Sequence, residues 1–336
     1  MKTKSSSIFI IIGFSIIFLL ILHAEQAAAG AIEGIDLCLK SVIPSLFPFF
    51  LITNWINCLL PSLSFPPTRL LARILHLPKG SEGILLIGLI GGYPVGAQAI
   101  TDAWKRKILN TQQAQIVLGF CSNAGPAFIF GITRILFSSH WIPWILWTIH
   151  IVSALIVGSV LPRIETAEIV FIPKEPISIS QAMKQSISII ACVCGWIVGF
   201  KTLLYMVAPF IPNMLYLTTL SGLLELSSGC LQLSQIASQQ MRMILCTMFL
   251  AFGGICVLLQ TSSVTEKLGL GYYLPGKIMQ MIVSLWLCIP ISGLLYHDVT
   301  LLTYKVFAFY GISGLVLMGL IKHCRKSCGN LSNLEV

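Results

Sequence analysis

Charged residues are scarce in this chain, and long hydrophilic segments are missing. Asp, Glu, Lys and Arg make up 10% of the 336 residues, whereas a soluble domain carries about 25%. The longest hydrophilic stretch, Arg163 to Lys184, is too short to fold alone. Hydrophobic residues reach 56% and recur in long runs along the whole length. These features exclude a soluble globular protein and predict one integral membrane domain.

The sequence also lacks the motifs of common nucleotide-driven and hydrolytic enzymes. It contains no Walker A sequence, dinucleotide fingerprint or HExxH, and no GxSxG elbow. The eleven cysteines are scattered, and pairs such as Cys192 and Cys194 lack the spacing of a zinc or redox motif. We interpret them as small apolar packing residues. We therefore expect no enzyme activity, no metal site and no cofactor.

Basic residues outnumber acidic ones by 21 to 12, which gives a net charge of +9. The densest basic tract, Lys105 to Lys107, has no interleaved aromatic residues, so we expect no nucleic-acid partner. Lys and Arg gather in the cytoplasmic loops of multi-pass membrane proteins. We interpret the positive charge in this way, with membrane lipid as the surroundings of the chain.

Eight apolar segments are long enough to cross a bilayer, which takes roughly 20 residues each. The first could be a secretory signal peptide, because Lys2 and Lys4 precede an apolar run and three alanines follow it. His23 and Glu25 are unfavourable residues directly before a signal-peptide cleavage site, so we favour an uncleaved helix. The eight segments lie near 8–24, 38–60, 112–137, 141–161, 186–210, 241–262, 275–295 and 302–321.

Two further apolar stretches, near 83–103 and 213–237, are interrupted in the middle. The first contains Gly-Gly-Tyr-Pro at 91–94, and the second contains Glu225 beside Ser-Ser-Gly at 227–229. Each is followed by another broken segment, at 122–126 and at 252–254. Irregular backbone at membrane depth is tolerated where it lines a cavity, and paired broken segments indicate the binding site of a transporter. We predict two re-entrant helical hairpins.

The distribution of Lys and Arg predicts the topology. With the N-terminus in the cytoplasm, eight crossings and two hairpins place most basic residues inside, among them Lys267 and Lys277 in the connection after the sixth crossing. The order crossing, hairpin, crossing, crossing then occurs twice in opposite orientation, which is an inverted repeat. The expected units are an N-terminal helix at 1–37, a first repeat at 38–162, a cytoplasmic linker at 163–185, a second repeat at 186–295 and a last helix with a basic tail at 296–336.

Polar residues at the interruptions are the candidate binding residues. Glu225 stands out because an ionisable group at membrane depth is costly. It could bind a coupling cation or proton, donate to a solute, cap a half-helix or pair with Lys201. Arg134 is a weaker candidate. The predicted substrate-binding residues are Gly92, Tyr93, Ser122, Asn123, Glu225, Ser227, Ser228 and Gln260.

Several motifs resemble the sporulation integral membrane protein YlbJ family, which carries two copies of a nucleoside recognition, or Gate, domain. They are Pro-Ser-Leu-Phe-Pro-Phe-Phe at 44–50, Gly-Gly-Tyr-Pro-Val-Gly-Ala at 91–97 and Ser-Asn-Ala-Gly-Pro at 122–126, with weaker matches at 222–225 and 252–254. The resemblance covers roughly residues 38–295. It implies an all-α fold similar to the core of concentrative nucleoside transporters, with paired hairpins meeting in the membrane.

The resemblance further implies a carrier in a membrane around the developing spore of an endospore-forming bacterium, with dipicolinic acid as cargo. The residues themselves suit a flat aromatic dianion: they offer backbone N–H groups at broken helix ends, hydroxyls and an aromatic ring. A nucleoside would suit the same groups. A non-transporting membrane scaffold in spore envelope assembly is the alternative from a different class.

Overall fold

The computed structural model describes residues 2–56, 66–75, 77, 81–162, 177–296 and 304–332, which form helices and no strand. The first half contains α1 (Lys2–Leu22), α2 (Ala24–Leu37), a π-helical turn (Cys38–Val42), α3 (Ile43–Ile56), α4 (Pro66–Ile74), α5 (Glu82–Ile90), α6 (Val95–Lys105), α7 (Thr111–Cys121), α8 (Pro126–Leu136) and α9 (Ile142–Val160). The second half contains α10 (Ile179–Val207), α11 (Met214–Leu224), α12 (Leu226–Gln232), α13 (Gln239–Phe252), α14 (Gly254–Thr265), α15 (Tyr273–Tyr296) and α16 (Tyr304–Ser332). Short 3-10 turns cover Ala208–Phe210, Leu233–Gln235 and Glu266–Leu268.

Six helical runs within the described residues are long and apolar enough to cross a membrane. They cover Ala24–Ile56, Thr111–Leu136, Ile142–Val160, Ile179–Phe210, Gln239–Thr265 and Tyr273–Tyr296. Each overlaps one of the predicted crossings, and the chain is therefore a helical, multi-pass membrane protein. The other two predicted crossings overlap α1 and α16, whose side chains the structure describes only in part.

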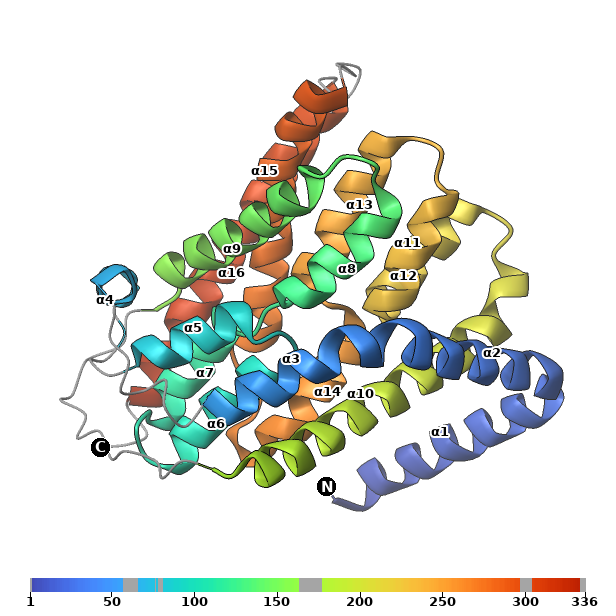
Figure 1. Ribbon diagram of the computed structural model, residues 1–336, viewed down its shortest axis with the longest axis horizontal. Coiled ribbons are helices and arrows are strands. Elements are labelled where there is room, and N and C mark those ends of the chain that lie inside the picture. The colour runs from blue at the N-terminus through green and yellow to red at the C-terminus, as the bar shows by residue number, and fades with distance from the viewer. Residues whose placement is uncertain are drawn as a thin grey trace.

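The helix that contains the second predicted crossing is longer than the sequence suggested. The chain reverses direction at His23, between α1 and α2, and then runs as one helical segment from Ala24 to Ile56 (Figure 1). The expected boundary between residues 37 and 38 therefore falls inside a helical run, where the π-helical turn begins at Cys38. The expected linker at 163–185 lies outside the described residues up to residue 176, and α10 already begins at Ile179.

Long helices form the frame, and short helices fill it. Helix α10 packs along α2 and α3, while α15 packs against α9, α13 and α7. The short pairs α5–α6 and α11–α12 each pack as two helices joined by a tight turn (Figure 1). In the second pair the two backbones lie very close together. A Cβ atom added to Gly229 would lie only 2.1 Å from the Cα atom of Gly222.

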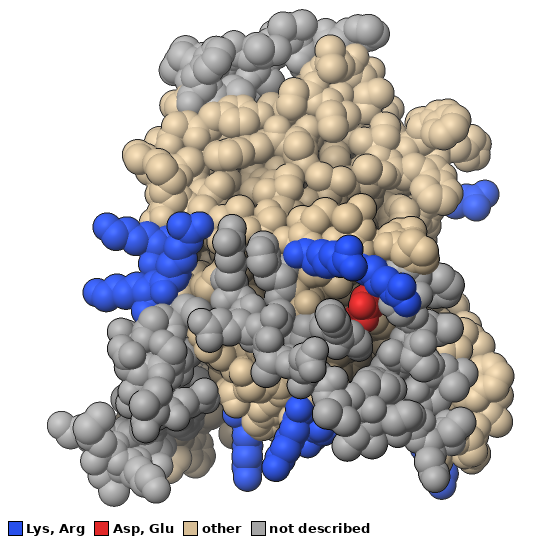
Figure 2. Space-filling model, turned by 90° about the vertical axis from the view of Figure 1, so that its left-hand side faces the viewer, with Lys and Arg blue, Asp and Glu red and all other residues tan. Residues whose placement is uncertain are grey.

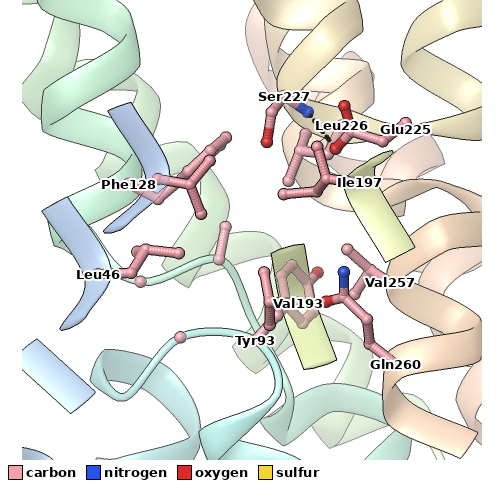
Figure 3. Close-up of a pocket in the computed structure, with 14 residues that line it drawn as sticks. Leu46, Tyr93, Phe128, Val193, Ile197, Glu225, Leu226, Ser227, Val257 and Gln260 are labelled. Carbon is pink, nitrogen blue, oxygen red and sulfur yellow. Dashed lines mark hydrogen bonds between the residues drawn. The ribbon is translucent and has the colours of Figure 1, made fainter. Parts of the chain in front are cut away.

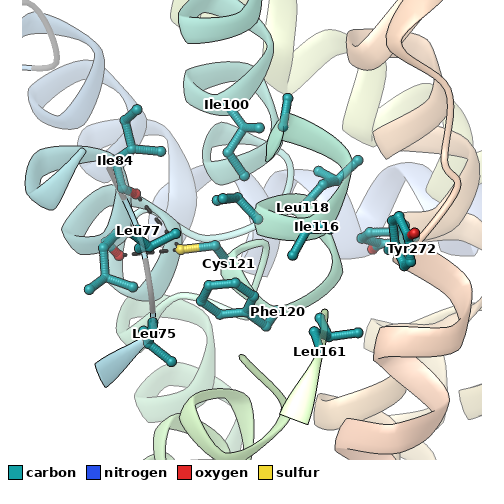
Figure 4. Close-up of a cluster of buried hydrophobic side chains, with 14 of the residues drawn as sticks. Leu75, Leu77, Ile84, Ile100, Ile116, Leu118, Phe120, Cys121, Leu161 and Tyr272 are labelled. Carbon is teal, nitrogen blue, oxygen red and sulfur yellow. Dashed lines mark hydrogen bonds between the residues drawn. The ribbon is translucent and has the colours of Figure 1, made fainter. Parts of the chain in front are cut away.

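A buried apolar cluster supports the end of α7. Ile100 of α6 and Leu118 and Phe120 of α7 are fully buried there, against Leu161 and Tyr272 (Figure 4). The Cys121 thiol donates to the carbonyl oxygens of Ile84 and Leu85 in α5, at 3.9 and 3.7 Å. Close packing of this kind fixes the position of the residues that follow Cys121.

Basic residues gather on one face of the protein, and the exposed Trp141 at the start of α9 lies away from it. Lys and Arg gather on the face that forms the left side of Figure 1, where α4, the start of α7 and the end of α16 lie (Figure 2). Helix α9 ends on that side and begins away from it, at Trp141, which is 74% exposed. Tryptophan is enriched at membrane interfaces and Lys/Arg in cytoplasmic loops. The predicted topology also places Lys79, Arg163 and Lys174 in the cytoplasm, and these three residues lie outside the described residues.

Candidate functional site

The structure brings the four predicted interruptions together. A Cβ atom on Gly92, in the turn between α5 and α6, would lie 3.3 Å from the backbone nitrogen of Gly125, in the break between α7 and α8. One on Gly253, between α13 and α14, would lie 3.3 Å from Tyr93 Oη. One on Gly254 would lie 3.2 Å from the carbonyl oxygen of Leu224, beside the break between α11 and α12. Backbone interruptions from both halves of the chain therefore meet at one place.

A small cavity lies where these interruptions meet. Its volume is about 40 Å³, which is room for one or two water molecules. Phe128 and Leu46 lie on one side of it, with Ile197 and Val257 on the other (Figure 3). Five of the predicted binding residues line it: Gly92, Tyr93, Glu225, Ser227 and Gln260. Its other walls are Val42, Ala124, Gly125, Val193 and Leu226.

Glu225 is held by the helix that it precedes. It is 2% exposed, and its two carboxylate oxygens accept hydrogen bonds from the backbone N–H groups of Ser227 (2.8 Å) and Ser228 (2.6 Å). The side chain is thus the N-cap of α12, where the free N–H groups and the positive end of the helix dipole stabilise an anion. This arrangement explains how a carboxylate is accommodated inside an apolar region.

Lys201 does not neutralise Glu225, which was one of the expected roles of that lysine. Its Nζ atom lies 3.8 Å from a carboxylate oxygen of Glu33 on α2 and above the ring of Tyr205. The sequence could not show this, because the partner comes from a helix about 170 positions away. Arg134, the other basic candidate, is exposed on α8 and does not line the cavity.

Asn123 lies behind the cavity wall in a cluster of polar side chains. Its Nδ2 donates to the carbonyl oxygen of Phe120 at 2.7 Å, which caps the end of α7. Its Oδ1 accepts from Lys277 Nζ (3.2 Å) and Gln280 Nε2 (2.9 Å), both on α15. The neighbouring Ser122 is also fully buried and does not line the cavity. Ser228 is also fully buried and does not line the cavity, and its backbone N–H donates to the Glu225 carboxylate.

Lys277 lies inside the protein rather than in an exposed connection. We expected it in a cytoplasmic connection, but it lies in the first turns of α15 and is 1% exposed. Besides Asn123, Nζ donates to Gln280 Oε1 at 2.8 Å, and it lies 5.1 and 5.8 Å from the ring centres of Tyr93 and Tyr273. The sequence carried a signal, because Lys277 falls within the predicted crossing 275–295 and an ionisable residue there is a functional candidate.

Gly276 explains why the start of α15 is inside the protein. A Cβ atom at this position would lie 2.0 Å from the carbonyl oxygen of Gly119 on α7. The two helix backbones therefore approach as closely as two glycines permit, and the next residue, Lys277, is carried to the end of α7 beside Asn123.

His150 of α9 completes the polar cluster. Its Nε2 accepts a hydrogen bond from the backbone N–H of Ala124 at 3.1 Å, and its carbonyl oxygen accepts from Gln280 Nε2 at 3.2 Å. Ser153 and Ser284 connect α9 and α15 one turn further on, at 2.7 Å. Sequence analysis did not identify His150 or Gln280, since nothing in the sequence marks which polar residues of two distant helices face each other.

The groups around the cavity can bind a small polar ligand. They offer a capped helix start, an amide, a tyrosine with no hydrogen-bond partner for its hydroxyl among the described residues, and a buried amine. Within the described part of the chain no group of three or more His, Cys, Asp or Glu residues could hold a metal ion. In comparisons with models of protein families, with curated proteins and with solved structures, nothing matched this chain.

Proposed function

We propose that the chain is a membrane carrier for a small anionic or polar solute. The observation that carries this proposal is the meeting of interrupted segments from both halves around one cavity. Secondary transporters bind their solutes at such discontinuous helices, where free backbone groups take part in binding. A scaffold would have no need of unwound backbone and buried polar side chains at a shared cavity.

The carrier would consist of two Gate-type units in inverted orientation. In this proposal α5–α6 and α11–α12 are the re-entrant hairpins, and α7–α8 and α13–α14 are the broken crossings. Equivalent contacts support the pairing: α6 packs against α14, and α12 packs against α8. Likewise α7 packs against α15, and α13 packs against α9. Alternating access then follows from movement of one unit against the other.

The size of the cavity indicates that this is a closed conformation. Ligand pockets usually have volumes of about 300 to 1,000 Å³, and this cavity measures about 40 Å³. A second hollow of about 300 Å³ adjoins it, lined by Lys40, Ser41 and Ser45. Phe128 and Ser227 line both spaces. A solute would enter by way of the hollow once these two side chains separate.

The proposed solute is dipicolinic acid, moved during endospore formation across a membrane that surrounds the forespore. This rests on the resemblance to the YlbJ family and on the mixture of donors, hydroxyls and an aromatic ring at the site. A nucleoside is the second candidate, because the same groups could bind a base and a ribose. A coupling proton or cation would bind at Glu225 in either case.

Uptake into proteoliposomes tests the proposal. The purified chain should accumulate labelled dipicolinate, and unlabelled dipicolinate should compete more strongly than nucleosides. Stronger competition by nucleosides would favour the second candidate. A protein that takes up neither solute, and that supports spore formation with Glu225, Ser227 and Gln260 all replaced, would be a scaffold.

A further inference from the structure

Lys277 carries a buried amine that has no acidic partner among the described residues. Two other lysines do have acidic partners, since Lys40 pairs with Asp36 and Lys201 pairs with Glu33. Lys277 instead meets two amide oxygens, of Asn123 and Gln280, and two ring faces. A buried charge without a counter-charge is expensive, so an anion that arrives beside this amine would stabilise its protonated form.

The other titratable groups around Lys277 do not supply that anion. The phenols of Tyr93 and Tyr273 face it with their rings. The Cys121 thiol donates to carbonyl oxygens of α5. His150 Nε2 accepts from a backbone N–H, so that nitrogen carries no proton. Gln280 and Asn123, whose side-chain oxygens accept hydrogen bonds from Lys277 Nζ, are neutral amides.

Glu225 lines the cavity and already has partners. Both of its oxygens accept from N–H groups at the start of α12. Its charge is therefore compensated by the positive end of that helix. The Lys277 amine, by contrast, contacts the amide oxygens of Asn123 and Gln280, and neither of these groups is charged.

The Lys277 amine is one side chain away from the cavity. Tyr93 lines the cavity, and the centre of its ring lies 5.1 Å from Nζ. Ala124 and Gly125 line it as well and directly follow Asn123, which Nζ contacts. Charges interact over this range when little water lies between them, because screening by solvent is weak inside a protein.

We propose that Lys277 supplies the positive charge that holds the carboxylate of a solute in this cavity. The site would then prefer carboxylates over neutral molecules of the same shape. The inference rests on the proposed function in one respect, since it takes the cavity as the solute site. It adds the charged group that selects the solute and the class to which the solute belongs.

Two compounds of matched shape test this preference. Pyridine-2,6-dicarboxylate and its neutral diamide would be titrated into the purified full-length protein in detergent, with binding measured by calorimetry. We expect wild type to bind the dicarboxylate at least about tenfold more tightly, as an attraction between charges in a low-dielectric site permits. Wild type that binds both compounds equally, or neither, would overturn the proposal.

Variants then test whether the preference for the dicarboxylate depends on the Lys277 amine. Lys277→Met should lower affinity for the dicarboxylate about tenfold and leave that for the diamide within about twofold, whereas Lys277→Arg should keep the preference. Lys201→Met is the matched control, because it removes another buried lysine, the one that pairs with Glu33 on α2. A Lys277→Met protein that retains the wild-type preference would contradict the assignment.

Asn123→Asp provides a second route if Lys277→Met does not fold. It places a carboxylate where Lys277 already makes a 3.2 Å contact, so the chain itself supplies the counter-charge. The preference for the dicarboxylate should then disappear although Lys277 remains. An unchanged preference would reject the proposal. Charge-dependent binding without uptake in proteoliposomes would reject the carrier function and leave the role of Lys277 intact.

Discussion

At the scale of the residue, Glu225 combines a structural role with a proposed functional one. Its carboxylate caps α12 with two hydrogen bonds. Glu225→Gln keeps one acceptor oxygen and loses the charge, which should cost about 1 kcal/mol of stability. We expect normal abundance in the membrane, a slightly lower melting temperature and no coupled transport. Glu225→Asp keeps both the charge and the cap, and should transport.

The two variants separate the roles, because melting temperature reports the cap and uptake reports the charge. Wild-type uptake by Glu225→Gln would remove this charge from the mechanism. Adding Lys201→Met should not rescue Glu225→Gln, since Lys201 pairs with Glu33. Rescue would mean that the two charges interact in another conformation of the carrier.

The residues of the site differ in how visible they are in the sequence. Glu225, Tyr93 and Ser227 could be predicted because each lies at an interruption that composition reveals. Lys277 and His150 could not be placed, because their meeting depends on where α9 and α15 pack against the break after α7. The sequence marks Lys277 as an ionisable residue within a predicted crossing, but it does not show that the side chain is buried, because long side chains near a helix end can reach the membrane surface.

At the scale of the element, close approach between α7 and α15 positions the polar cluster. Gly276→Ala would place a Cβ atom 2.0 Å from the carbonyl oxygen of Gly119. The helices must then separate, at a cost of about 1 to 3 kcal/mol, as for other overpacked sites. We expect a lower melting temperature in detergent and weaker solute binding, because Lys277 moves with α15.

Gly195→Ala is the matched control for that variant. Gly195 lies within α10, and a Cβ atom there meets nothing within 4 Å. Alanine is the better helix former by about 1 kcal/mol, so stability should be unchanged or higher. If Gly276→Ala melts at or above the temperature of Gly195→Ala, contact between α7 and α15 does not position the cluster.

The interrupted helices were easier to predict than their neighbours. Glycine and proline mark breaks in any helix, so the four interruptions could be located from composition alone. The extent of the helix from Ala24 to Ile56 was not predicted, because residues 24–37 contain Glu25, Glu33 and Asp36 and the apolar run of the crossing begins only after them. In the structure residues 24–37 form α2, which packs along α10.

For the whole molecule, the separation of the basic face from Trp141 predicts an orientation in the membrane. Single cysteines in place of Lys105 and Lys322 should be labelled only from the cytoplasmic side, and one in place of Trp141 only from the opposite side. The reason is that the basic face and the start of α9 lie apart (Figures 1 and 2). Labelling of Lys105 and Lys322 positions from opposite sides would contradict the topology with two re-entrant hairpins.

Ser227 lies where the closed cavity would open, because it lines both the cavity and the adjoining hollow. A Ser227→Cys protein should therefore lose uptake after treatment with a methanethiosulfonate reagent, because the added group blocks the path between the two spaces. Solute should slow the reaction by occupying that path. Ser263→Cys, at an exposed position of α14, is the control and should react without loss of uptake. Wild type treated in the same way accounts for the native cysteines. If modified Ser227→Cys still transports at the untreated rate, the solute does not pass between Phe128 and Ser227, and the route through the hollow is wrong.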